Sequence, residues 1–320
     1  MDAKKPSENK NLQAQGSIKV APGGRASVNI NDLIPPGAKI SSIRRASPPG
    51  TIATVDIATP SYRSQFSAQY VHSLFSVVAK AASRKIHLTY SNFDGAEIVT
   101  ARNYMISNFY YNKPHCTHLL FIDDDMGFDS KLIFSMIDLK QDLVGVIAPK
   151  RSVDLRKLHA AKDLPFEQAY AKALDFIGIP KAVRARKSVS ISAQVSGQGS
   201  VAQPKVVQSK LDVQPFMEVE SCGAGIMLIS RACIDRMIVA CPDVVDTVRF
   251  KRHPFLAKDF KDKFLVPFNP IVTEKRAMSE DISFCYRWTD RCGGKVFAAA
   301  TSSIKHVGQQ IVEGRYSDSV

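Results

Sequence analysis

Between residues 51 and 148, short apolar segments alternate with segments whose apolar residues recur at helical spacing. Short apolar runs that end at polar or turn residues indicate buried strands, whereas a spacing of three and four residues indicates amphipathic helices. This alternation predicts an α/β fold in which helices flank a mostly parallel sheet. The predicted strands are 51–58, 85–90, 118–122 and 142–148, and the predicted helices are 61–81, 95–111 and a third that begins at Asp129 or Ser130.

The same pattern resumes after an interruption at residues 151–214, where we expect a helix over 155–176 and then a loop or a hairpin of 188–195 with 201–207. Further on, the pattern predicts strands at 226–229, 295–300 and 303–307 and helices at 230–238 and 279–291, the last capped by Ser279. Residues 1–50 are polar and rich in Gly and Pro, with room for a hairpin at 18–30. We therefore predict one α/β domain over 51–308 with an insertion at 151–214, an N-terminal extension at 1–50 and a tail at 309–320.

The composition narrows the class of protein and of partner. The chain has 43 Lys and Arg against 30 Asp and Glu, a formal net charge of +13, which favours anionic partners such as nucleotides, nucleic acid or acidic glycans. The six cysteines show neither a C-x-x-C pair nor zinc spacing, so we expect reduced thiols in the cytoplasm. No segment has the length of an apolar transmembrane span, so any work at a membrane would be peripheral.

Three adjacent carboxylates, Asp123, Asp124 and Asp125, directly follow the predicted strand 118–122. Their mutual repulsion requires a cation or strong hydrogen-bond donors nearby. Open α/β sheets bind ligands outside the carboxyl ends of their strands. If the segment stays extended, Asp123 and Asp125 share one face, where their oxygens would suit Mn²⁺ or Mg²⁺ together with the oxygens of a phosphate.

A Walker B strand, a phosphatase site or a helix cap could also place acids at the end of a strand. A Walker B strand would need a G-x-x-x-x-G-K-[ST] loop, which does not occur in the chain. A phosphatase with an aspartyl nucleophile usually has Thr or Val where this chain has Gly127. A loop that only caps the next helix remains possible, although a single Asp is enough for capping.

Several features in order along residues 51–308 resemble the GT-A glycosyltransferases, specifically their family-two-like group. They are a first strand ending near Pro60, the pair Arg102-Asn103 in a helix before the D-x-D strand, the glycine-rich segment at Gly223 and Gly225, the pair Glu280-Asp281, and a late His306. The usual Gln-x-x-Arg-Trp acceptor motif of the polysaccharide synthases in this group is absent.

The resemblance implies a role for each matching residue. Asp123 and Asp125 would bind Mn²⁺ or Mg²⁺ and the donor, His306 would be a further metal ligand, and Asp281 with Glu280 would supply the catalytic base. The donor-binding residues implied in the same way are Thr59, Pro60, Tyr62, Arg102, Asn103, Asp123, Asp124, Gly223 and Gly225. The implied activity is inverting transfer of a sugar from a UDP- or GDP-sugar to an acceptor that the sequence does not identify.

Two other classes of function remain open from the sequence. A sugar nucleotidyltransferase also combines a related fold with a metal, but it usually has a glycine-rich loop after the first strand, and residues 59–63 contain no glycine. A nucleic-acid-binding protein would explain the net charge and the basic segment 184–187, although no binding motif appears. Both ideas could combine in a transferase that acts on modified DNA.

Overall fold

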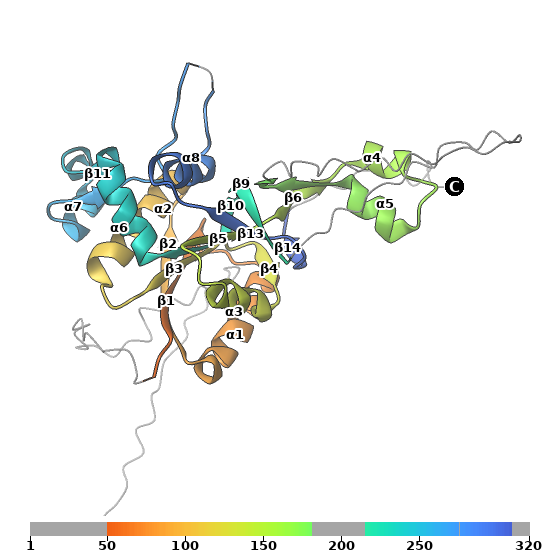
Figure 1. Ribbon diagram of the computed structural model, residues 1–320, viewed down its shortest axis with the longest axis horizontal. Helices are drawn as coiled ribbons and strands as arrows, with labels where there is room; N and C mark the ends of the chain where they lie inside the picture. The colour runs from red at the N-terminus through yellow and green to blue at the C-terminus, as the bar shows by residue number, and fades with distance from the viewer. Residues whose placement is uncertain (1–49, 181–214, 275, 309–320) are drawn as a thin grey trace, which may run out of the picture. The chain divides into compact units, whose positions relative to one another are not determined.

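The computed structural model describes residues 50–180, 215–274 and 276–308, all of which belong to a unit that begins at Ala46. The predicted tail, all of the N-terminal extension except Gly50, and the two predicted hairpins therefore lie outside the described residues. Within them, an eight-stranded, mostly parallel sheet is flanked by helices (Figure 1), as the alternation predicts. In spatial order the strands are β2 Ile86–Asp94, β1 Ala53–Ser61, β3 His118–Ile122, β10 Gly223–Ser230, β5 Leu143–Val146, β13 Val296–Ala299, β9 Phe216–Ser221 and β8 Ile179–Pro180.

The direction of the strands decides which segments share an edge of the sheet. Strands β1, β2 and β3 are mutually parallel, and β13 is parallel to β5, while β10 runs antiparallel between β3 and β5. The carboxyl ends of the parallel strands consequently meet the amino end of β10 at one edge. This edge gathers Asp123, the glycines that begin β10, and the segments that leave β5 and β13.

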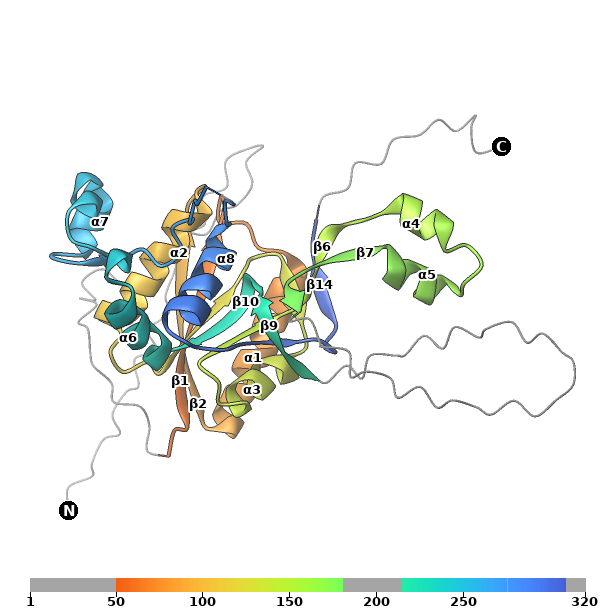
Figure 2. The same cartoon turned by 45° about the horizontal axis from the view of Figure 1, so that its top comes forward.

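Helices cover both faces of the sheet (Figures 1 and 2), and each face has its own apolar core. On one face lie α1 Ala68–Ala81 and α3 Ser130–Asp138, whose predicted inward residues Leu132, Ile133, Met136 and Ile137 are all buried. On the other lie α2 Ile98–Ser107, α6 Arg231–Ala240 and α8 Glu280–Tyr286. Asp129 caps α3 by accepting from the backbone N–H of Lys131 at 2.8 Å.

Short helical turns extend or join these elements. After α2 and α8 the chain continues as the π-helical turns η3 Asn108–Asn112 and η6 Arg287–Arg291. The 3₁₀ turns are η2 Ala82–Arg84, η4 Pro242–Val244 and η5 Arg249–Arg252. The predicted helix over 61–81 begins later than expected, because β1 runs to Ser61 and the next residues form a loop.

The insertion differs from its prediction. In place of one helix over 155–176, the structure has α4 Leu155–Ala160, α5 Phe166–Ala173 and the strand β7 Leu174–Ile177. Strand β7 pairs antiparallel with β6 Ala148–Val153, and these elements form an arm beside the sheet (Figure 2). The helical prediction fails because Pro165 stands at the start of α5, where the chain has already turned.

Two smaller pairs of strands complete the described residues. Strand β4 Met126–Phe128 follows the aspartates at once and pairs antiparallel with β14 Ile304–His306. Residues 240–277 contain β11 Val245–Asp246, β12 Phe264–Leu265 and α7 Pro254–Asp259. A separate apolar cluster fixes this region, with Phe250, Leu256, Phe260, Phe264 and Val266 as its buried members.

Two expectations about the whole chain can be compared with the structure. All six cysteines are free thiols, and all except Cys292 are buried, as expected of small apolar side chains. Within the part of the chain that the structure describes, no helix combines the length and the apolar character needed to cross a bilayer, in agreement with the sequence.

Candidate functional site

The three aspartates lie in a turn at the carboxyl end of β3. The backbone N–H of Asp123 donates to Gly225 O at 2.8 Å, and the backbone N–H of Met126 donates to Asp123 O at 3.1 Å. The chain is therefore not extended here, and the expectation of alternating faces is wrong. The turn directs each carboxylate to a different partner: Asp123 to Arg102, Asp124 to the loop after β1, and Asp125 to the arm.

Arg102 is a buried cation at the centre of this acidic edge. Its Nη2 donates to Asp123 Oδ2 at 3.1 Å, its Nη1 donates to Ala224 O at 3.1 Å, and its Nε lies 3.8 Å from Glu280 Oε1. The guanidinium also lies over the ring of Phe121, 5.4 Å from the centroid. One side chain of α2 thus connects the end of β3, the start of β10 and the first turn of α8.

Asp125 and His306 face each other across the ladder of β4 and β14. The distance from Asp125 Oδ2 to His306 Nε2 is 3.6 Å, and His306 Nδ1 donates to Pro149 O at 2.8 Å. Arg151, on β6, forms an ion pair with the same Asp125 oxygen, and its Nε donates to His306 Nε2 at 2.9 Å. The Pro149 contact holds the imidazole with the Nε2 lone pair toward the carboxylate and Arg151, the tautomer that a metal-binding histidine needs.

Two carboxylate oxygens of this site are buried without a hydrogen-bond partner within the described residues, Asp123 Oδ1 and Asp125 Oδ1. Buried acceptors without a donor are costly, and hard divalent cations favour carboxylate oxygens. These two oxygens and His306 Nε2 therefore fit a cation such as Mn²⁺ or Mg²⁺ chemically. With the side chains in these positions, the described residues contain no group of three or more His, Cys, Asp or Glu close enough together to hold a metal ion.

Electrostatics at this edge favour protonated acids. Burial, and then repulsion from Asp125, raises the pKa of Asp124 to about 6, although the backbone N–H of Tyr62 donates to its carboxylate and opposes the rise. Burial also raises the pKa of Asp123, and Arg102 opposes that rise. Burial and the neighbouring Asp281 raise the pKa of Glu280. Cations at this edge would therefore be bound with release of protons.

The residues implied for base binding have mixed positions. The side chain of Tyr62 is exposed, its backbone N–H donates to the Asp124 carboxylate, and the guanidinium of Arg63 lies 4.9 Å from the ring centroid. The hydroxyl of Thr59 is buried against that of Tyr70, with 2.6 Å between the oxygens, and Pro60 is buried in β1. Only Tyr62 of the three presents its side chain to solvent.

Asn103 has a structural position next to Arg102. Its amide donates to Asn269 Oδ1 at 2.9 Å and its oxygen accepts from the N–H of Phe268 at 3.0 Å. Both ends of this buried side chain are thus used to fix the segment that leads to α8. Asn103 thus lies close to the site, but its amide is not free to bind a sugar donor.

The two glycines at the start of β10 allow close packing at the edge. A methyl group on Gly223 would lie 2.9 Å from Ile177 Cγ2 and 3.8 Å from Asp281 Oδ2, and one on Gly225 would lie 3.4 Å from Asp123 Oδ2. Asp281 Oδ1 accepts from the N–H of Ile282 at 2.8 Å and from the hydroxyl of Ser279. Ser279 occupies the predicted N-cap position of α8. Its side chain bonds to Asp281, however, and accepts no hydrogen bond from the backbone of the helix.

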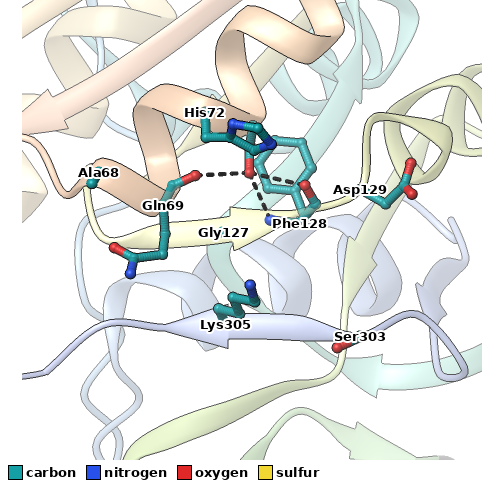
Figure 3. Close-up of a pocket in the computed structure, with 9 residues that line it drawn as sticks. Ala68, Gln69, His72, Gly127, Phe128, Asp129, Ser303 and Lys305 are labelled. Atoms are coloured by element: carbon teal, nitrogen blue, oxygen red, sulfur yellow. Dashed lines mark hydrogen bonds between the residues drawn. The ribbon is translucent and has the colours of Figure 1, made fainter.

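Behind the ladder of β4 and β14 lies a separate pocket of about 490 Å³ (Figure 3). Lys305 faces it from β14, and Gln69 and His72 line it from α1. Neighbouring residues of a strand point to opposite sides, so Lys305 and His306 serve different sides of the ladder. Gly127 lets α1 and β14 approach, because a methyl group there would lie 2.9 Å from Gln69 Cβ.

Arg151 is the residue of this site that the sequence analysis missed. It was placed at the start of an insertion, with no role in the site. A signal was present, since Lys150 and Arg151 follow the predicted strand 142–148, and the corresponding β5 runs in the same direction as β3, both being antiparallel to β10. The carboxyl ends of parallel strands lie at one edge, which brings cations that follow one strand near acids that follow another.

Comparisons with known proteins give little beyond this geometry. No family model matches the sequence, and no curated protein is similar to it. The crystal structure of A197 from STIV matches 82% of this chain and 99% of that chain, with 11% identity and a TM-score of 0.35. A glycosyltransferase involved in the glycosylation of the major capsid of PBCV-1 matches 29% of this chain and 52% of that chain, with 15% identity and a TM-score of 0.24. At such TM-scores neither likeness establishes a fold or an activity.

Replacing Arg102 by Met should lower the free energy of unfolding by about 3–5 kcal/mol, because it leaves buried carboxylates without their counter-charge. Adding Asp123→Asn to this variant should recover part of the loss, since the amide needs no cation. Urea unfolding in EDTA of both single variants and the double variant measures the coupling. Additive losses would contradict a direct interaction between Arg102 and Asp123.

Replacing Asp124 by Asn should stabilise the protein more at pH 7 than at pH 4. The folded pKa of about 6 lies above the ordinary value of 3.8, so the wild type loses stability as pH rises between these values. The amide does not ionise, and its oxygen still accepts from Tyr62. Unfolding midpoints of both proteins in EDTA across this range check the prediction, and a difference that is independent of pH would contradict it.

Proposed function

We propose that this chain is a glycosyltransferase of the GT-A type, which moves a sugar from a UDP- or GDP-sugar to an acceptor hydroxyl with inversion. The observation that carries the proposal is a pair of buried oxygens, Asp123 Oδ1 and Asp125 Oδ1, which have no donor among the described residues and lie at the carboxyl edge of the sheet with an oriented His306. Buried carboxylate oxygens without a donor suit a ligand that brings its own cation, as a metal nucleotide does.

The residues divide the work according to their positions. Asp123, Asp125 and His306 would hold Mn²⁺ or Mg²⁺, which neutralises a diphosphate and makes it a better leaving group. Tyr62, whose backbone N–H donates to Asp124, has an exposed ring on which a nucleotide base would stack. Arg102 holds Asp123 in place, and Asn103 and Thr59 support the walls of the site instead of contacting the donor.

Asp281 is the proposed catalytic base. Its Oδ1 is held by Ser279 and by the backbone of Ile282, which leaves Oδ2 on the side of Gly223 at the same edge. Oδ2 would take the proton of the acceptor hydroxyl while that oxygen bonds to the anomeric carbon. The bond from this carbon to the diphosphate breaks, and the nucleoside diphosphate leaves with the electron pair. Glu280 keeps its neighbouring position in the ion pair with Arg102.

The surplus of basic residues supports an anionic acceptor, such as a nucleic acid or an acidic glycan. A gel-shift series with duplex DNA at increasing salt tests the nucleic-acid form of this idea, because phosphate contacts weaken steeply with salt. The absence of binding at low salt would leave a glycan as the acceptor class.

Asp125→Asn should remove the Mn²⁺-dependent stabilisation by UDP or GDP. A ligand at about 100 times its Kd stabilises by about 2.7 kcal/mol, which is a rise of roughly 5–10 °C in Tm for a domain of this size. Asp163→Asn, which removes an equal charge from the arm, should keep the full shift. The measurement is a thermal melt with each nucleotide, with and without Mn²⁺. An unchanged shift in Asp125→Asn would contradict the role of this carboxylate.

Asp281→Asn should lower turnover by about 100-fold or more, because the amide cannot accept the proton. The Mn²⁺-dependent stabilisation by nucleotide should stay at the wild-type value, since Asp281 is not placed on the donor diphosphate. Release of nucleoside diphosphate from a panel of UDP- and GDP-sugars gives the rate, and Asp290→Asn is the matched control. Full turnover in Asp281→Asn, or a product with retained anomeric configuration, would exclude this base.

A further inference from the structure

Arg151 connects the arm to the acidic turn. Its backbone lies in β6, between the pairing partner β7 and the segment after β14, where a methyl group on Gly308 would be only 2.9 Å from Arg151 Cβ. The backbone is thus closely packed, whereas the side chain is 59% exposed. Because the backbone is packed and the side chain is exposed to solvent, the guanidinium can change partners without movement of the strand.

The two atoms that the guanidinium contacts belong to the proposed metal ligands Asp125 and His306. It forms an ion pair with Asp125 Oδ2 and donates from Nε to His306 Nε2 at 2.9 Å. The lone pair on His306 Nε2 serves only one electrophile at a time, either the N–H of Arg151 or a metal ion. A divalent cation held by Asp125 and His306 would therefore displace the guanidinium from both.

The displaced guanidinium would remain within one side-chain length of Asp125. A planar guanidinium binds phosphate oxygens through two parallel N–H donors and keeps its charge at any relevant pH. A diphosphate that accompanies the cation brings the negative charge that Arg151 loses when it leaves Asp125. The exchange thus leaves no cation or anion at this edge without a partner.

We infer that Arg151 exchanges partners on donor binding: it neutralises Asp125 in the free protein and binds the donor diphosphate once Asp125 takes up a divalent cation. This inference rests on the proposed function, and it adds a diphosphate-binding residue supplied by the insertion. It also gives the arm a role, since the strand that carries Arg151 is positioned by its pairing with β7.

The test is isothermal titration calorimetry of Arg151→Gln, Arg151→Lys and wild type with Mn²⁺ alone and with UDP or GDP in saturating Mn²⁺. Arg151→Gln should bind Mn²⁺ several-fold more tightly than wild type, because the competing cation is gone. It should bind the nucleotide about 10-fold or more weakly, since a charge-assisted hydrogen bond is lost. Arg151→Lys should lie between the two in nucleotide affinity.

The control is Arg156→Gln, which removes the same charge from α4 and should match wild type in both titrations. Thermal melts of each variant without ligand verify that it is folded. Wild type that binds Mn²⁺ and nucleotide while Arg151→Gln gives the same two affinities would overturn the exchange and leave the proposed function standing. Tighter Mn²⁺ with unchanged nucleotide would also overturn it, because Arg151 would then be a counter-charge only. Wild type that binds neither would overturn both proposals.

Discussion

The described site depends on one buried guanidinium, that of Arg102, set among carboxylates. Burying a charge costs several kcal/mol unless partners compensate for it, and here Asp123, Glu280 and the carbonyl of Ala224 do so. Asp123 follows β3, Glu280 begins α8 and Ala224 lies in β10. The contacts that neutralise Arg102 therefore also hold these three elements together. The acidic edge and the core beneath it are therefore stabilised together.

A second consequence concerns the charge at this edge. Arg102 satisfies one oxygen of Asp123, and Arg151 satisfies one oxygen of Asp125, which leaves the other oxygen of each buried and without a donor among the described residues. Such unsatisfied acceptors are rare in stable proteins unless a ligand completes them. The proposed cation would complete both of these acceptors.

Much of the fold followed from local pattern. The strand 118–122 and the inward residues of α3 were predicted because periodicity and a capping Asp129 are properties of neighbouring residues. Three features were not predicted: the antiparallel β10 between β3 and β5, the short helices of the arm, and the cluster within 240–277. The first and the third depend on packing between segments far apart in the chain, which overrides weak local preferences. The short helices of the arm depend instead on Pro165, which ends the helical pattern locally.

The site divides in the same way. The aspartates were recognisable because adjacent charges at the end of an apolar strand demand a reason wherever they occur. The positions of Asn103 and Thr59 were not, since their partners, Phe268–Asn269 and Tyr70, are known only from the fold. Arg151 was missed because its connection to Asp125 comes from the edge that β3 and β5 share, and the residues next to it in the sequence do not indicate that connection.

The central claim is that a divalent cation bridges Asp123 and Asp125 to a donor diphosphate. Crystals grown with Mn²⁺ and UDP or GDP, measured at the manganese absorption edge, test it most directly. The account predicts an anomalous peak in contact with Asp125, with phosphate oxygens on its open side. Nucleotide bound without a peak there, or manganese bound elsewhere on the chain, would contradict the account.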